Sequence, residues 1–241
     1  MLIADELKRK ETKLSLFMAR QYSGGESFNK LAMGYDFMDS LHNNNDYFIE
    51  RMPDRRELAL DIGCGTGIVA QALANYFGKV VGIDISNEML SIARNKRTAP
   101  NIEYLEMDAE TVYPGTKYDY IVSRTTFHHI RDVPAMIEKL KSMTNSGGRI
   151  AILDCTYEKG SPSIARNIAV AYLSFAFDAG RIGFKNAARI FSFRISRPWL
   201  EHLASDKYPT KKQFTELYER CLPGCTIERE KCFMGVVWEN R

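Results

Sequence analysis

Short apolar runs alternate with segments of helical spacing between Glu57 and Asp154. Each run holds about five residues rich in β-branched or aromatic side chains, which is typical of a buried strand. The runs are Leu58–Ile62, Val80–Ile85, Ile102–Met107, Tyr118–Ser123 and Arg149–Leu153. An order of strand, helix and strand predicts a parallel sheet.

Capping residues mark where two of the intervening helices begin. Ser86 precedes a helical pattern over residues 87–97, and Asp132 precedes Val133 and Pro134 in a first turn. Side chains of Ser and Asp accept hydrogen bonds from free N–H groups at a helix start, and Pro suits the first turn. The second helix should end before Gly147 and Gly148.

The end of the chain predicts one more helix and two further strands. Thr210 and Gln213 have the spacing of a capping box for a helix that runs to Arg220. After Pro223 and Gly224, the runs Thr226–Glu230 and Cys232–Glu239 resemble strands. We expect them to form an antiparallel pair that closes the sheet.

Two stretches, residues 1–56 and 160–206, are helical in pattern and fall outside the alternation. No repeat or flexible linker separates them from the rest, so residues 1–241 are predicted to form a single α/β domain. Its parts are a core of about 57–154, a helical cap of about 160–206 and closing strands of about 225–239. The fold class is a Rossmann-like, seven-stranded sheet with helices on both faces.

Composition excludes several classes of protein. With 45% apolar residues, 26% charged residues and a net charge of +3 over 241 residues, the chain is too apolar to stay disordered. The longest nearly apolar run, residues 168–177, is half of what a membrane span requires. Charged residues interrupt the N-terminus, so no secretory signal is expected. Five cysteines without a C-x-x-C motif predict reduced thiols, no zinc site and a cytoplasmic location.

Basic residues gather in the cap. Between Lys159 and Leu200, seven Lys or Arg residues accompany one acidic residue, Asp178. This excess favours an anionic partner, although a solvated helix face explains such a run as well. The sequence has no dense basic patch of the kind that nucleic-acid binding usually requires, so no nucleic-acid partner is expected.

The first strand runs into a glycine-rich turn, residues 63–67, and a helix follows from Ile68. A turn of this kind lets a ligand approach the backbone and the amide groups of the helix start. The spacing is G-x-G-x-G, whereas the dinucleotide fingerprint is G-x-G-x-x-G. Asp61 stands before the turn, where a carboxylate repels a pyrophosphate but attracts an ammonium group. The pattern therefore favours an amino acid joined to a nucleoside.

Two later carboxylates fit the nucleoside. Asp84 ends the next strand, where an acidic side chain can accept hydrogen bonds from both ribose hydroxyls. Asp108 and Ala109 follow the third strand, where an adenine ring would lie, and the carboxylate can accept from its exocyclic amine.

Together these residues resemble the class I S-adenosylmethionine-dependent methyltransferases, specifically the small-molecule group called methyltransferase type 11. The resemblance covers about residues 28–154. The motifs that carry it are Leu60–Gly67, Val81–Ser86, Met107–Glu110, Tyr118–Ser123 and the Leu140–Leu153 stretch with its glycine pair. It implies a methyltransferase that uses S-adenosyl-L-methionine and requires no metal. The cofactor-binding positions it implies are Asp61, Gly63, Cys64, Gly65, Thr66, Gly67, Asp84, Ile85, Asp108, Ala109 and Arg124.

Arg124 departs from the family, in which this position is often small or neutral. It could bind the cofactor carboxylate, project towards an anionic substrate, or form an ion pair with a local acid such as Asp61.

The catalytic candidate is a histidine that follows the fourth strand. A hydroxyl or ammonium acceptor must lose a proton before it is methylated, and an imidazole suits that task. His128 and His129 are adjacent, so we expect only one of them to face the pocket, and we prefer His128. The alternative is that both pack at the junction of loop and helix.

Candidates for substrate contact are His128 and, in the variable segments, Tyr22, Tyr172 and Arg197. An apolar cap face with a basic rim suits a small acidic or amphipathic molecule, although packing or a homodimer interface accounts for the same residues. Alternative functions are a tRNA or protein methyltransferase, or a protein that binds the cofactor without transferring a methyl group.

Overall fold

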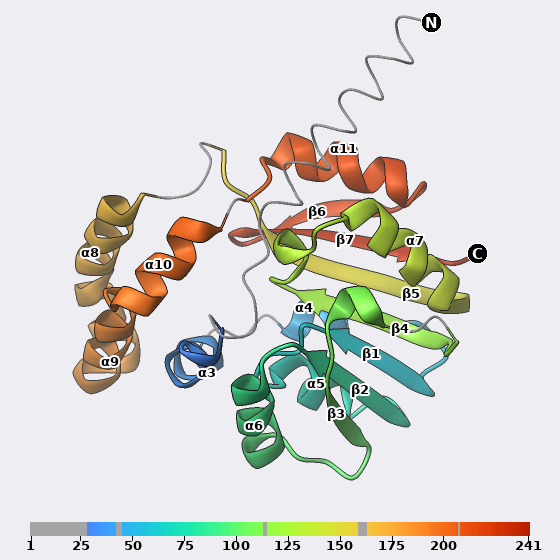
Figure 1. Ribbon diagram of the computed structural model, residues 1–241, viewed down its shortest axis with the longest axis horizontal. Helices are drawn as coiled ribbons and strands as arrows, with labels where there is room; N and C mark the ends of the chain where they lie inside the picture. Colours follow the sequence, from blue (N-terminus) through green and yellow to red (C-terminus); the bar gives the residue numbers. More distant parts are fainter. Residues whose placement is uncertain (1–27, 42–44, 113–114, 159–162, 207) are drawn as a thin grey trace, which may run out of the picture.

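The computed structural model describes residues 28–41, 45–112, 115–158, 163–206 and 208–241. Seven strands form one sheet in the order β3-β2-β1-β4-β5-β7-β6 (Figure 1). The strands are β1 (Leu58–Ile62), β2 (Lys79–Asp84), β3 (Ile102–Glu106), β4 (Tyr118–Arg124), β5 (Thr144–Cys155), β6 (Thr226–Glu230) and β7 (Phe233–Glu239). Strands β1 to β5 pair in parallel, and β7 runs antiparallel to both β5 and β6. The fold class and the closing antiparallel pair are confirmed.

Helices surround the sheet. They are α3 (Ala32–Ser40), α4 (Asn45–Ile49), α5 (Ile68–Leu73), α6 (Asn87–Lys96), α7 (Val133–Met143), α8 (Ile164–Ile182), α9 (Phe184–Arg194), α10 (Arg197–Ser205) and α11 (Lys211–Cys221), with 3-10 turns η1 (Ala109–Thr111) and η2 (Phe127–His129). Helices α8, α9 and α10 pack together and lie apart from the strands in Figure 1. No helix in the described ranges has the length and apolar character needed to cross a bilayer.

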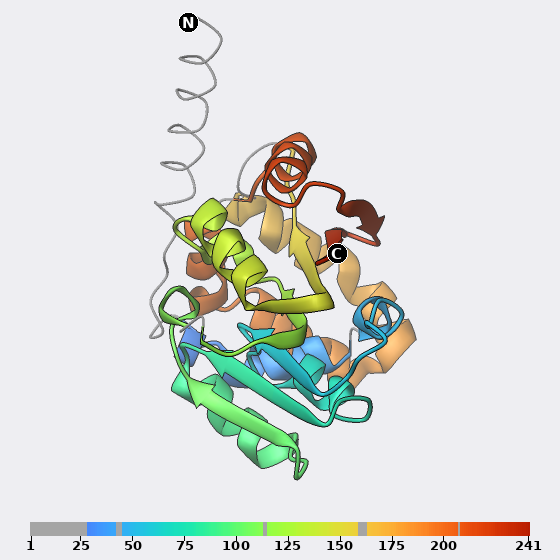
Figure 2. The ribbon, with the colours of Figure 1, turned by 90° about the vertical axis from the view of Figure 1, so that its right-hand side faces the viewer.

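Alternating strand residues build a core on each face of the sheet. On one face, Leu60 and Ile121 pack with side chains of α7 and α11. On the other, Ala59 and Tyr120 pack with side chains of α4 and α5. Figure 2 shows α7 and α4 on opposite sides of the strands. Burial on both faces explains why the parallel strands have nearly continuous apolar sequences.

The expected helix starts are confirmed. The Ser86 hydroxyl accepts the Met89 N–H at 3.2 Å, and the Asp132 carboxylate accepts the Ala135 N–H at 3.0 Å. Thr210 forms the complete capping box at the start of α11. Each side chain satisfies an N–H group that the helix itself cannot.

Strand β5 begins earlier than the sequence suggests. It starts at Thr144, which pairs with Tyr118, and a register shift between Tyr118 and Tyr120 accommodates the extra residues. Gly147, at φ +73°, lies inside the strand. The glycine pair, which we expected to separate helix from strand, is therefore part of an irregular strand.

Sheet order reverses between β1 and β4, because β2 lies beyond one and β5 beyond the other. At such a point the loops after the two strands diverge and leave a crevice at the carboxyl edge of the sheet. Both the glycine turn after β1 and the histidine pair after β4 start from this edge.

Candidate functional site

A cavity of about 410 Å³ lies at this edge. The ends of β1, β2 and β4 line one part of it, and α9, α10 and the turn between β6 and β7 line another. The volume falls within the range of small-molecule sites.

Each of the three positions in the turn requires glycine for a different structural reason. All have positive φ, at +65° for Gly63, +52° for Gly65 and +84° for Gly67. A Cβ on Gly65 would meet nothing within 4 Å, so this residue leaves open space. A Cβ on Gly63 would lie 2.1 Å from Thr126, and one on Gly67 would lie 2.5 Å from the Tyr104 hydroxyl. Gly63 and Gly65 line the cavity. Gly67, which we expected to contact a ligand, is not among the cavity-lining residues.

Asp84 connects β2 to the glycine turn. Its Oδ2 accepts the Gly65 N–H and its Oδ1 accepts the Ser86 N–H, each at 2.8 Å. Burial raises the pKa of this carboxyl group, while these N–H donors act in the opposite direction. The side chain lines the cavity, and each carboxylate oxygen keeps lone-pair capacity for a ligand hydroxyl.

Asp61 is a buried carboxylate with an unsatisfied oxygen. The side chain is 1% exposed, and no described residue donates a hydrogen bond to Oδ2. Burial raises its pKa to about 7, although Arg124 and the Ala70 N–H favour the ionised form. A buried acceptor of this kind in a cavity wall matches a ligand that brings a cation, and the ammonium of S-adenosylmethionine is such a group.

Arg124 forms its ion pair with Asp39 of α3, so the partner is a local acid other than Asp61. Nη2 contacts Asp39, whereas Nη1 has no hydrogen-bond acceptor among the described residues. The guanidinium lines the cavity and offers this donor to an anion.

The remaining residues expected at the cofactor also line the cavity, namely Cys64, Thr66, Ile85, Asp108 and Ala109. Asp108 is the N-cap of η1, and its Oδ1 accepts the Glu110 N–H at 2.9 Å. The Cys64 thiol is buried, which raises its pKa.

His128 is held by a carboxylate at the end of β5. Its Nδ1 lies 2.6 Å from Asp154 Oδ1, and its backbone N–H donates to Asp154 Oδ2 at 2.8 Å. Burial alone would lower the pKa of His128, but the negative charge of Asp154 raises it above 6.5. A carboxylate at Nδ1 selects the tautomer that leaves Nε2 as the acceptor.

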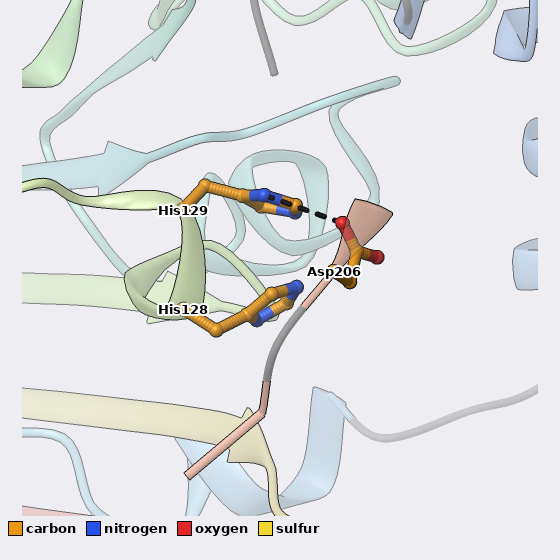
Figure 3. A group of neighbouring side chains, drawn as sticks. All are labelled: His128, His129 and Asp206. Atoms are coloured by element: carbon orange, nitrogen blue, oxygen red, sulfur yellow. Dashed lines mark ion pairs between the residues drawn. The ribbon is translucent and has the colours of Figure 1, made fainter. Parts of the chain in front are cut away.

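The two histidines lie side by side, with ring centroids 4.0 Å apart, and both line the cavity (Figure 3). Our expectation that only one could face the pocket is wrong. In η2 both rings leave the turn on the same side and extend towards Asp206.

Sequence reasoning missed a polar group contributed by the cap. Asp206, at the end of α10, accepts from the Tyr208 hydroxyl at 3.0 Å, and its Oδ2 lies 3.4 Å from His202 Nε2. Burial lowers the pKa of His202 and raises that of Tyr208. His202 and Tyr208 line the cavity, and the i,i+4 spacing of His202 and Asp206 is the one sequence signal that could have found them.

His128, His129 and Asp206 each offer a ligand atom, and these atoms lie within 4.8 Å of one another. Around one tetrahedral zinc ion, bonds of about 2.1 Å place ligand atoms about 3.4 Å apart. The three side chains would have to move closer together to hold an ion, and as they stand His129 Nδ1 faces Asp206 Oδ1 at 3.8 Å, the distance of an ion pair.

Two substrate candidates lie away from the cavity. Tyr172 is 64% exposed and its ring packs against Phe191, while Arg197 pairs with Glu201 on the surface. Neither is among the cavity-lining residues, and Tyr22 lies outside the described residues. The cap instead contributes Arg194 and Trp199, which no motif marks.

Comparison with known proteins relates the chain to methyltransferases. Residues 60–152 match the family model described as a methyltransferase domain. A demethylmenaquinone methyltransferase of Oceanobacillus iheyensis is 28% identical over 169 residues, which are 67% of each chain. An uncharacterized methyltransferase of Mycobacterium bovis is 29% identical over 200 residues, covering 80% of this chain and 93% of its own.

Among solved structures, the complex of DhpI with S-adenosylhomocysteine superposes with a TM-score of 0.60 over 92% of this chain and 96% of its own, at 17% identity. At that identity the likeness concerns the fold alone. Residues 60–152 are thus a methyltransferase domain, and the chain is similar in sequence to class I S-adenosylmethionine-dependent methyltransferases of the type 11 group and has the fold of a solved methyltransferase complex.

Proposed function

We propose that this enzyme methylates an O, N or C atom of a small organic molecule that binds between the glycine turn and the cap. The observation that carries the proposal is a single cavity lined both by the glycine turn and by His128 and Trp199. Its two ends offer space for a cofactor and an acceptor next to each other. Transfer requires that neighbouring placement, because the acceptor atom must lie in line with the methyl carbon and the sulfur.

At the cofactor end, three charged side chains would bind different parts of S-adenosylmethionine. Asp61 would accept from the ammonium group, Arg124 Nη1 would donate to the carboxylate, and Asp84 would accept from the ribose hydroxyls. The unsatisfied Oδ2 of Asp61 and the free Nη1 among the described residues support the first two roles. Asp108, Ala109 and Ile85 would border the adenine.

S-adenosylmethionine supplies a methyl group that its sulfonium already activates. The chain itself must bind the acceptor, exclude water and take up a proton where the acceptor carries one. We assign the proton to His128 Nε2. Asp154 would act as the positioning residue, because it holds Nδ1 and stabilises the protonated ring.

The lining of the acceptor end supports an acidic or amphipathic acceptor. Phe28, Tyr35, Trp199 and Phe233 provide aromatic surface, and Arg194, which pairs with Asp178, provides a guanidinium group. Apolar walls with a few polar groups are typical of sites for small organic ligands. Free cysteines throughout the chain support the proposal that the enzyme works in the reducing cytoplasm.

His128→Asn tests the catalytic assignment. Wild-type protein is first assayed for S-adenosylhomocysteine formation with acceptors carrying hydroxyl, amine, carboxylate or activated-carbon groups. On the best acceptor, the variant should lose about 10² to 10⁴-fold in turnover while it keeps its cofactor affinity. Wild-type turnover should fall as the pH decreases through the raised pKa of His128, and the variant should lose this limb.

Two further variants distinguish catalysis from structure. Asp154→Asn should lower the histidine pKa and move the acidic limb to lower pH, since the charge that raises that pKa is gone. Arg197→Gln, on the surface, should behave as wild type. Wild-type turnover and an unchanged pH profile in His128→Asn would remove this residue from the reaction.

A further inference from the structure

The outer face of α8 is apolar and exposed. Val170, Leu173 and Phe177 are spaced by three and four residues, and they are 51%, 82% and 72% exposed. Side chains at these spacings share one face of a helix. Eight large hydrophobic side chains are exposed in the described ranges, and six of them lie on α8 or at the first residue of α9. Scattered exposed hydrophobics need no explanation, but a contiguous group of this kind marks an interaction site.

The inner face of the same helix has its own partners. Asp178 is buried and receives a 2.6 Å hydrogen bond from Arg194 of α9, which also donates to Ser174 at 2.9 Å. Ala171 is buried beside them. These contacts fix the rotation of α8, so the apolar stripe faces outwards as a consequence of the packing.

Positive charge surrounds the stripe. Arg166 lies four positions before its first residue and Arg181 four positions after its last, so both extend from the same face. Lys185 and Arg189 are exposed on α9. Residues 163–197 include six Lys or Arg residues. Arg194 pairs with Asp178, the only acidic residue in that range, and Arg197 pairs with Glu201.

We propose that this face docks on an anionic lipid bilayer, with α8 lying along the membrane surface. The α8 face is defined here as Val170, Leu173 and Phe177 with Arg166 and Arg181. The apolar side chains would enter the boundary between headgroups and acyl chains, and the arginines would extend to lipid phosphates. Each basic residue near an anionic surface strengthens such binding.

Charge favours lipid over a second copy of the chain. A two-fold interface places the same patch of both subunits together, so the positive α8 faces would oppose each other without an exposed carboxylate between them. Anionic headgroups neutralise the same charges. Because α9 and α10 also contribute Arg194, Trp199 and His202 to the cavity, docking would bring the cap side of the cavity close to the bilayer.

Vesicle sedimentation with the full chain tests the proposal. Wild-type protein should pellet with phosphatidylcholine vesicles that contain about one third phosphatidylglycerol, and much less with phosphatidylcholine alone. Leu173→Gln combined with Phe177→Gln should weaken binding at least about tenfold. Arg166→Gln combined with Arg181→Gln should weaken it about 25-fold, from roughly fivefold per charge. Met33→Gln, at an exposed apolar residue of α3, is the matched control and should bind as wild type.

Three results would overturn the proposal. The first is no binding of wild type to the anionic vesicles at low salt, and the second is undiminished binding by both double variants that melt like wild type. The third is a wild-type dimer, seen by sedimentation velocity, that the Leu173 and Phe177 changes dissociate while vesicle binding is absent. None of these measurements requires cofactor or acceptor, so the outcome is independent of the methyl-transfer proposal.

Discussion

Replacing Asp61 with Asn should stabilise the ligand-free enzyme and weaken its hold on the cofactor. Asp61 is fully buried at the end of β1, and its Oδ2 receives no hydrogen bond from a described residue. A buried carboxylate that lacks a partner is costly to ionise. Asn has nearly the same shape, and its amide oxygen can accept the Ala70 N–H that Asp61 accepts. The substitution thus removes the charge with little change in packing.

The size of the effect follows from the pKa of this group. Burial raises the pKa of Asp61 from 3.8 to about 7. Each tenfold change in proton affinity corresponds to about 1.4 kcal/mol, so ionised Asp61 costs the folded state on the order of 4 kcal/mol at pH 8. Asp61→Asn should raise the free energy of unfolding by an amount approaching that value.

The effect must depend on pH in a defined direction. A carboxyl group whose pKa is raised by folding contributes most stability below its unfolded pKa, near 3.8, and loses it as the pH rises towards about 7. The cost in wild type is therefore complete above pH 7 and falls to less than half of that value at pH 5. Urea unfolding of both proteins at pH 5 and pH 8 should show a smaller difference at the lower pH.

The same substitution should weaken cofactor binding. If Asp61 binds the ammonium group, Asp61→Asn should weaken S-adenosylhomocysteine binding by about 1.5 to 3 kcal/mol in calorimetry. Wild-type binding near pH 7 should also release protons, measured in buffers of different ionisation enthalpy, since the ligand cation favours the carboxylate. A variant that is less stable than wild type at pH 8 and binds equally well would refute both the charge argument and the placement.

Three other substitutions separate binding from stability. Asp84→Ala should weaken S-adenosylhomocysteine binding by about 1.5 to 3 kcal/mol and also lower Tm, because the carboxylate holds two backbone N–H groups of the turn; unchanged affinity in calorimetry would exclude the ribose role. Gly67→Ala should cost on the order of 1 to 3 kcal/mol in urea unfolding, given φ +84° and the Tyr104 hydroxyl 2.5 Å away, yet alter affinity little. Phe48→Ala should cost about 3 to 5 kcal/mol at a fully buried site, whereas Tyr76→Ala, at an exposed residue, should cost little; equal losses would contradict the core assignment.

Local chemistry explains why much of the fold was predictable. Strand β1 is apolar because both of its faces are covered, and Ser86, Asp132 and Thr210 cap helices through contacts within three residues of themselves. Such signals depend on neighbouring residues only, so the sequence contains them in full. The start of β5 escaped prediction because its pairing with Tyr118 is a contact between distant residues, and a glycine pair usually marks a turn.

The residues of the candidate site were likewise predictable only in part. Asp61 and Asp84 could be predicted to line the cavity because each lies at or next to the carboxyl end of a strand, at the edge where ligands bind, and that position follows from the order of elements. Asp154 and Asp206 were missed because their importance lies in what they touch. In the sequence, Asp154 is predicted only to end a strand and Asp206 only to end a cap helix. The contacts of Asp154 with His128 and of Asp206 with Tyr208 form only in the folded chain.

Trp199 is an intrinsic fluorescent probe of the cavity. The chain has two tryptophans, and Trp199 lines the cavity, where its ring packs against Phe193 and lies 5.7 Å from the ring of His202. Trp238, on β7, donates its indole N–H to the Pro223 carbonyl and is not among the cavity-lining residues. Tryptophan emission from a Trp238→Phe protein would therefore come from Trp199 in the cavity wall alone. Its colour and intensity would follow the polarity and quenching around Trp199 as ligands enter, so occupancy could be titrated in solution without a label.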